Sequence, residues 1–238
     1  MAKREEIFYQ NLIISEDDKI RAVRALNSKG VEKHILIKEK LLNWSDSEKI
    51  EYSKIASTYR YDKRIRAVLF KYISYLEEFY RAVILDNYVE CPMQTFWNKK
   101  LQEQLEKYDM DLNSSLEQIE FSTLLNQCKI LPDNIKTQCH FPLKHLTSNL
   151  RALTALRNAV MHNKFLLLYR GYEKCYVQGV DNGRSANLKA NILNLIQFLP
   201  TEVGRQCVKD INACKENRNT ENDTVWDLPS QVTVVLGV

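Results

Sequence analysis

The sequence predicts a mainly α-helical protein built as one domain. Six glycines and five prolines in 238 residues are too few for the many tight turns of a β-sandwich or barrel. Apolar side chains instead recur every three or four positions, which is the period of an amphipathic helix. A hydrophobic content of 45% is typical of a globular protein with a sizeable core. We therefore expect one helical domain over 1–238, with an N-terminal extension (1–58), a core (59–200) and a C-terminal helix and tail (201–238).

Short helices are expected in the N-terminal part. A candidate helix over 17–27 ends before Gly30, because glycine readily takes the left-handed conformation that follows a helix. Further helices are expected at 32–42 and 46–57.

The longest predicted helix spans 60–88 and ends before Pro92, which lacks an amide hydrogen and disfavours helix before it. Within it, Glu77 and Arg81 stand four residues apart in the order that favours an ion pair. Such charges either form surface salt bridges or support a site, in which case Glu77 or Glu78 positions a site arginine. The apolar positions of this helix repeat at helical spacing and are Tyr61, Ile65, Val68, Tyr72, Leu76, Phe79 and Val83.

The pattern of apolar residues over 94–129 predicts two helices, one on each side of a polar stretch at 109–115. A second break follows at Pro132. The next helix is expected to begin at Phe141-Pro142, with proline in its first turn, and to run to about Asn163.

The C-terminal part combines turns, two helices and a tail. Residues 172–180 could pair as a short β-hairpin, since glycines lie on either side of this segment. Helices are expected at 185–198 and 201–217. The tail over 219–238 ends in a β-prone run that packs as a strand or is mobile.

Composition excludes several classes of protein. No run of 18 apolar residues occurs and the first residues lack a secretory apolar region, so we expect a cytoplasmic protein that does not span a membrane. The six cysteines form no C-x-x-C pair, which favours reduced thiols. Cys139, His140 and His145 match no common zinc spacing, so neither a metal nor another cofactor is expected.

The net charge of +4 permits an anionic partner without requiring one. A solvated helix face is the simpler explanation for either cluster taken alone, but the basic residues gather around two segments. The two clusters are Arg60, Lys63, Arg64, Arg66 and Lys71, and Lys144, Arg151, Arg157, Lys164 and Arg170.

The segment over 153–165, L-T-A-L-R-N-A-V-M-H-N-K-F, carries the strongest chemical signal. It sets Arg157, Asn158 and His162 near the end of an amphipathic helix. An imidazole can move protons to and from a ribose 2′-hydroxyl near neutral pH, and a guanidinium can hold a phosphate whose charge grows in the transition state. The spacing therefore fits a metal-free ribonuclease site.

Helical geometry divides these residues between two faces. Arg151, Asn158 and His162 share a polar face within about 40°, whereas Arg157 projects about 140° from His162 into the arc of the leucines. A guanidinium among apolar side chains needs a partner, and Glu77 or Glu78 are the candidates. Either the helix loosens near Met161 or a second copy completes the site.

The R-N-x-x-x-H string resembles the R-x4-6-H signature of HEPN ribonucleases. The upstream segment over 59–84, Y-R-Y-D-K-R-I-R followed by Y-L-E-E-F-Y-R, is similar to the paired blocks of the Abi-like, abortive-infection HEPN family. L-N-S-K-G-V over 26–31 resembles that family's early turn, so the likeness covers roughly 20–200. One departure is His162-Asn163-Lys164, where relatives often carry a second histidine and then an arginine.

The resemblance implies a HEPN-type bundle and a homodimer through 150–165, in which two motif helices form one composite cleft. It further implies a metal-independent endoribonuclease of a bacterial anti-phage or toxin-antitoxin-like system, with a small non-coding RNA or a protein antitoxin as a second partner. Arg157, His162 and Asn158 are the implied catalytic residues, Glu77, Glu78 and Arg81 the supporting ones, and Arg151, Lys164, Arg66 and Lys63 the RNA-binding ones.

Two other interpretations stay open. The same basic cleft could bind RNA or a partner without cutting it, as a regulatory HEPN module. Arg157 and His162 could also be structural residues of a helical protein that has no such site.

Overall fold

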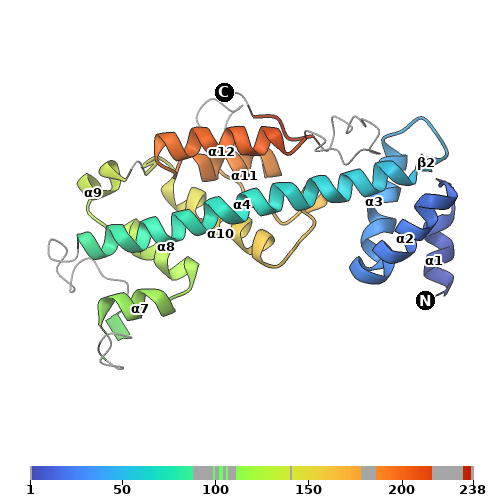
Figure 1. Cartoon of the computed structure of the whole chain (residues 1–238). Coiled ribbons are helices and arrows are strands. Elements are labelled where there is room, and N and C mark those ends of the chain that lie inside the picture. Colours follow the sequence, from blue (N-terminus) through green and yellow to red (C-terminus); the bar gives the residue numbers. More distant parts are fainter. Residues whose placement is uncertain are drawn as a thin grey trace. The chain divides into compact units, whose positions relative to one another are not determined.

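The computed structural model is mainly helical, which confirms the predicted fold class (Figure 1). The structure describes residues 2–87, 99, 102–103, 106, 111–139, 141–177, 186–215 and 233–236. The break at Pro92, most of the first helix expected over 94–129, the second half of the expected hairpin and most of the tail lie outside these residues. No helix among the described segments combines the length and apolarity that crossing a bilayer requires.

The chain forms two compact units. Unit 1 comprises Met1–Ile65 and Asn212–Val234, and unit 2 comprises Arg66–Ile211 and Val235–Val238. The boundary lies inside one long helix, seven residues beyond the expected end of the N-terminal extension at 58. Most of the helix expected over 201–217 belongs to unit 2 rather than to a separate C-terminal element.

Unit 1 contains helices close to the expected ones and two strands that the sequence did not reveal. Two-residue strands carry too little pattern to be recognised. Leu12 pairs with Ile50 in a parallel ladder, and the predicted helix at 46–57 is wrong over its first residues, which instead lead into this strand. The elements are α1 (Ala2–Tyr9), β1 (Leu12–Ile13), α2 (Glu16–Lys29), α3 (Val31–Asn43) and β2 (Ile50–Glu51).

Side chains close the helix ends of unit 1. Ser15 accepts a hydrogen bond from the Asp18 amide as the N-cap of α2, and Gly30 follows α2 with the expected positive φ of 86°. Lys38 is buried, yet its Nζ donates to the carbonyls of Ile7 and Gln10 at the end of α1. Burial lowers the pKa of this ammonium group.

Helix α4 (Tyr52–Asp86) joins two helices that were expected to be separate. No glycine or proline interrupts residues 52–86, so nothing in the backbone ends the helix near residue 58. At that point the Thr58 hydroxyl donates to the Lys54 carbonyl, a bond that helices tolerate. Near its start, Tyr61 is fully buried and accepts a hydrogen bond from the Val234 amide at 2.9 Å.

Unit 2 places its other helices around the second part of α4. The motif helix begins later than expected, because His145 takes a left-handed conformation (φ 57°) and only Leu146 starts α10. The stretch at 109–115 is helical from Leu112, with Asp111 as N-cap. The helices are α7 (Leu112–Gln118), α8 (Phe121–Ile130), α9 (Asp133–Gln138), α10 (Leu146–Met161), the 3-10 turn η1 (Leu166–Leu168), α11 (Leu188–Ile196) and α12 (Thr201–Ala213).

A buried asparagine network takes the place of the expected hairpin. Residues 172–177 form no strand; instead the fully buried Asn149 side chain accepts from the Tyr176 amide at 2.8 Å and donates to its carbonyl at 3.1 Å. Asn194 of α11 donates to the Asn149 carbonyl at 2.9 Å, and Gln197 donates to Tyr176. The Asn149 side chain thus forms the backbone hydrogen bonds that a neighbouring strand would otherwise supply, and it holds this segment against α10.

Cysteine thiols fill parts of the core. Cys128, Cys139, Cys175, Cys207 and Cys214 are buried, and they form no disulfide within the described part of the chain. Burial raises the pKa of the Cys175 thiol to about 11, so this sulfur stays protonated and behaves as a small apolar group.

We expect Asn149→Ala to destabilise unit 2, because it removes the partner of the Tyr176 amide and one of the two donors to the Tyr176 carbonyl, which also accepts from Gln197. The free energy of unfolding should fall by about 1–3 kcal/mol, the cost of leaving one polar group inside the protein unsatisfied. Urea denaturation measures this. The matched control is Asn113→Ala on α7, where the side chain is exposed, and a change there as large as at Asn149 would contradict the assigned role.

Candidate functional site

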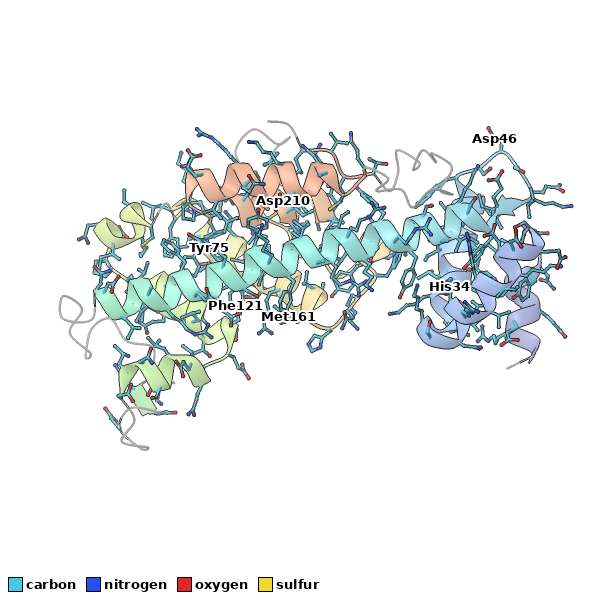
Figure 2. All side chains as sticks on the ribbon, in the orientation of Figure 1. His34, Asp46, Tyr75, Phe121, Met161 and Asp210 are labelled. Carbon is cyan, nitrogen blue, oxygen red and sulfur yellow. The ribbon has the colours of Figure 1, made fainter. Side chains whose placement is uncertain are left out.

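The motif helix ends in a defined hydrogen-bonded turn at His162. Asn163 follows it in the left-handed conformation (φ 51°), with its amide bonded to the Val160 carbonyl at 3.1 Å. The Lys164 amide donates to the Ala159 carbonyl at 2.9 Å. These two bonds form a Schellman motif, which stops the helix and leaves the His162 side chain exposed just after Met161 (labelled in Figure 2).

Arg66 of α4 is bonded to this turn. Its Nη1 donates to Asn163 Oδ1 at 3.1 Å, so a guanidinium lies beside the residue that follows His162. The sequence indicated Arg66 as an RNA-binding residue but gave Asn163 no role. Asparagine directly after a helix was the available signal, because it accepts the left-handed conformation better than most residues do.

Arg157 points to another part of unit 2. Its guanidinium carbon lies 5.7 Å from the ring centre of Phe121, the first residue of α8, which is labelled in Figure 2. This is the geometry of a cation–π contact. Its Nε is buried and has no hydrogen-bond partner among the described residues. Arg157 therefore lies among apolar side chains, as the helical geometry predicted. An aromatic ring, and not a carboxylate, contacts its guanidinium.

Neither Glu77 nor Glu78 pairs with Arg157 in the described structure. Glu77 forms the expected ion pair with Arg81, at 3.2 Å between Oε1 and Nη2. Arg81 Nε also donates to the Leu116 carbonyl at 3.0 Å, which ties α4 to α7. Glu78 is exposed. Arg81, paired with Glu77, therefore supports the packing of α4 on α7. Among the described residues, neither glutamate pairs with Arg157, which differs from their expected role beside a site arginine.

The predicted polar face of α10 is confirmed. Arg151, Asn158 and His162 are exposed, whereas the leucines of the opposite face, Leu150, Leu153 and Leu156, are buried. Leu143 lies before the start of the helix and is 49% exposed.

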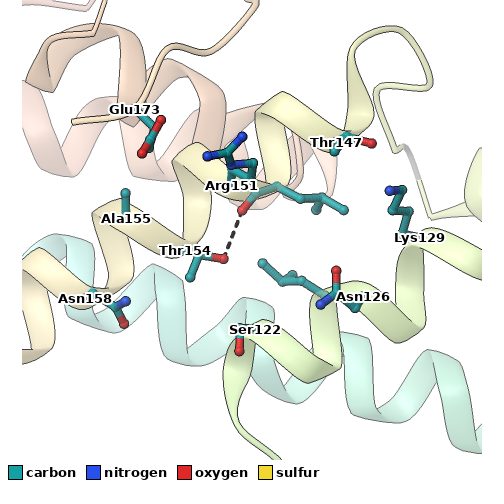
Figure 3. A pocket seen from close by; sticks show the side chains of 11 residues that line it. Ser122, Asn126, Lys129, Thr147, Arg151, Thr154, Ala155, Asn158 and Glu173 are labelled. Atoms are coloured by element: carbon teal, nitrogen blue, oxygen red, sulfur yellow. Dashed lines mark hydrogen bonds between the residues drawn. The ribbon is translucent and has the colours of Figure 1, made fainter. Parts of the chain in front are cut away.

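A groove of about 340 Å³ lies along this polar face, between α10 and α8. Figure 3 shows Arg151 and Asn158 on the α10 side and Asn126 and Lys129 on the α8 side. The sequence did not reveal this groove, because it depends on how two helices far apart in the chain pack. The lining residues are Ser122, Leu125, Asn126, Lys129, Thr147, Leu150, Arg151, Thr154, Ala155, Asn158 and Glu173.

The remaining expected RNA-binding residues lie on the surface. Lys164 is exposed immediately after the turn at Asn163. Lys63 is exposed on the part of α4 that belongs to unit 1.

The geometry gives the chain an accessible imidazole at His162 and a guanidinium, that of Arg66, bonded to the next residue. The His162 side chain makes no hydrogen bond or ion pair with any other described residue, so it is available to a ligand. Arg66, bonded to Asn163, and the exposed Lys164, which follows Asn163 in the chain, both add positive charge beside the turn. Such a surface can bind a phosphodiester and move a proton at it.

Comparisons with protein-family models, with curated proteins and with solved structures found no match to this chain.

Replacing Asn163 separates its two roles. Asn163→Gly keeps the left-handed turn and removes the bond to Arg66, whereas Asn163→Ala removes the bond and strains the turn. We expect the alanine variant to be less stable than the glycine variant by about 1 kcal/mol, as measured by thermal unfolding. Equal stability of the two would show that the positive φ at this position carries no cost.

Proposed function

We propose that this protein is a metal-independent endoribonuclease of the HEPN type. The observation that carries the proposal is the exposed His162 at the end of α10, with Asn158 on the same face and Arg66 beside the following residue. A proton-transfer group and cations that bind phosphate are the two components that cleavage of RNA at a 2′-hydroxyl needs.

In the proposed reaction the 2′-hydroxyl attacks the adjacent phosphorus, and the bond to the 5′-oxygen of the next nucleotide breaks. The products are a 2′,3′-cyclic phosphate and a 5′-hydroxyl. His162 takes the 2′-hydroxyl proton or gives one to the leaving oxygen, and Asn158 lies one helical turn before it, where it can orient the imidazole. Arg157 stabilises the charge of the phosphorane, with Arg66 and Lys164 as further phosphate ligands.

A second copy of the chain is part of the proposal. Within one α10, Arg157 packs on Phe121 and projects about 140° from His162, so the two side chains serve different sides of the helix. In a twofold-symmetric dimer through 150–165, Arg157 of one protomer can meet the His162 side of the other. The dimer thereby places guanidinium and imidazole at one phosphate without unwinding the helix.

A non-catalytic RNA-binding module is the alternative function. The groove along α10 favours it, because its polar lining could hold RNA whether or not His162 transfers a proton. For both the ribonuclease and the RNA-binding module, we propose the same biological role, which is bacterial anti-phage or toxin-antitoxin-like growth control in the cytoplasm. The proposed inhibitor is a small RNA or a protein antitoxin.

The test is cleavage of total bacterial RNA in EDTA by the purified protein, with analysis of the cut ends. We expect cyclic-phosphate ends from the unmutated protein and no cleavage of DNA. The rate should fall by about 10²–10⁴-fold in His162→Ala and by about 10²–10³-fold in Arg157→Ala. Arg205→Ala, an exposed arginine of α12, is the matched control and should cut at the normal rate.

RNA binding by His162→Ala distinguishes the two functions. A ribonuclease variant binds RNA without cutting it. If the unmutated protein also binds RNA and leaves every substrate intact, the non-catalytic module is correct. Comparable cleavage of DNA would exclude attack by the 2′-hydroxyl.

A further inference from the structure

The groove between α8 and α10 shares Asn158 with the proposed catalytic residues, and the rest of its lining has no role in the chemistry described above. Its lining includes the aliphatic side chains of Leu125, Leu150 and Ala155. Its rims carry hydrogen-bonding side chains from both helices, shown in Figure 3. A volume of about 340 Å³ falls within the range of pockets that hold small ligands or parts of larger ones.

The polar side chains that line the groove are available to a ligand. Asn126, Lys129, Arg151 and Asn158 form no side-chain hydrogen bond or ion pair with another described residue. By contrast, Thr154 is occupied, since its hydroxyl donates to the Leu150 carbonyl at 3.0 Å. The side-chain amides and cations that line the groove therefore have donors and acceptors that can bind a ligand.

Charge in the groove favours an anion. Lys129 and Arg151 contribute two positive charges from opposite rims, and Glu173 contributes one negative charge. Two amides, Asn126 and Asn158, offer both donors and acceptors, which is the combination that reads the edges of nucleobases. The lining contains no aromatic ring among the described residues, so bases would be held by their edges and not by stacking on a side chain.

The stripe of α10 residues that lines the groove points toward His162, which lies beyond the lining. At 100° per residue, Thr147, Arg151, Asn158 and His162 fall within an arc of about 60° on α10. From Thr147 to Asn158 this stripe is about 16 Å long, and His162 lies one further turn along the helix. A strand that follows the stripe would reach the imidazole without changing face.

We propose that this groove binds the single-stranded RNA segment on one side of the bond that is cut. The inference rests on the proposed ribonuclease function and assigns part of its substrate recognition. Lys129 and Arg151 hold the phosphates, and the amide of Asn126 reads a base edge. A length of about 16 Å accommodates no more than about five nucleotides, even when they are stacked at 3.4 Å each. Duplex RNA would bind more weakly, since its base edges are paired and turned inward.

The first test measures binding of a fluorescently labelled ten-nucleotide RNA to the non-cleaving His162→Ala protein by anisotropy, over a range of salt concentrations. Adding Lys129→Ala should weaken binding and reduce the slope of log affinity against log salt by about 0.7, the value for one phosphate on a single strand. Adding Asn126→Ala should reduce discrimination between bases at one position by at least about fivefold. Glu173→Gln should tighten binding, because it removes the opposing charge.

Lys209→Ala on α12 is the matched control, since this lysine is exposed and lies outside the groove. Unchanged affinity and salt slope in Lys129→Ala, relative to this control, would overturn the proposal. If Lys129→Ala and Asn126→Ala instead weaken self-association of the chain, the groove belongs to a second copy and the proposal is also wrong.

A second readout separates this proposal from the proposed function. In the His162-containing protein, Lys129→Ala should lower the cleavage rate more on the ten-nucleotide RNA than on a dinucleotide. If the protein cuts RNA and both variants behave like Lys209→Ala, the groove assignment fails while the ribonuclease function stands. If no RNA is cut, yet Lys129→Ala and Asn126→Ala lose binding as stated, the groove stands and the ribonuclease function fails.

Discussion

The geometry of one straight helix constrains everything proposed for this protein. An α-helix advances about 100° per residue, so two side chains five positions apart cannot share a face. In α10 this separates Arg157 from His162, and the contact of Arg157 with Phe121 fixes the separation structurally. This separation is the reason that the proposed site draws Arg157 and His162 from two copies of the chain.

The end of α10 supplies the second constraint. Because Asn163 takes a left-handed conformation, the chain turns away immediately after His162 and leaves the imidazole at an exposed corner. The bond from Arg66 ties this corner to α4, the longest helix. Members of the HEPN family that the sequence resembles often carry histidine at the position of Asn163. In this chain the asparagine has a structural role, because it takes the left-handed conformation and bonds to Arg66.

Sequence reasoning succeeded where a local pattern decides the outcome. The polar face of α10, the ion pair between Glu77 and Arg81, and Gly30 after α2 all follow from spacing along one helix. It failed where contacts between distant segments decide. Phe121 accommodates Arg157, Tyr176 pairs with Asn149, and neither partner is visible in the spacing around the residue it contacts. The groove could not be predicted for the same reason, since it exists only once α8 packs beside α10.

Subunit mixing tests the central claim most directly. Arg157→Ala and His162→Ala proteins are each inactive if both residues are required. In a mixed dimer, one protomer retains His162 and the other retains Arg157, so one complete pair forms across the interface. After exchange of subunits, confirmed by native mass spectrometry, we expect RNA cleavage to return to about a quarter of the unmutated rate, because half of the dimers are mixed and each has one of two pairs. Mixed dimers that form and remain inactive would show that the two residues do not act together across a dimer.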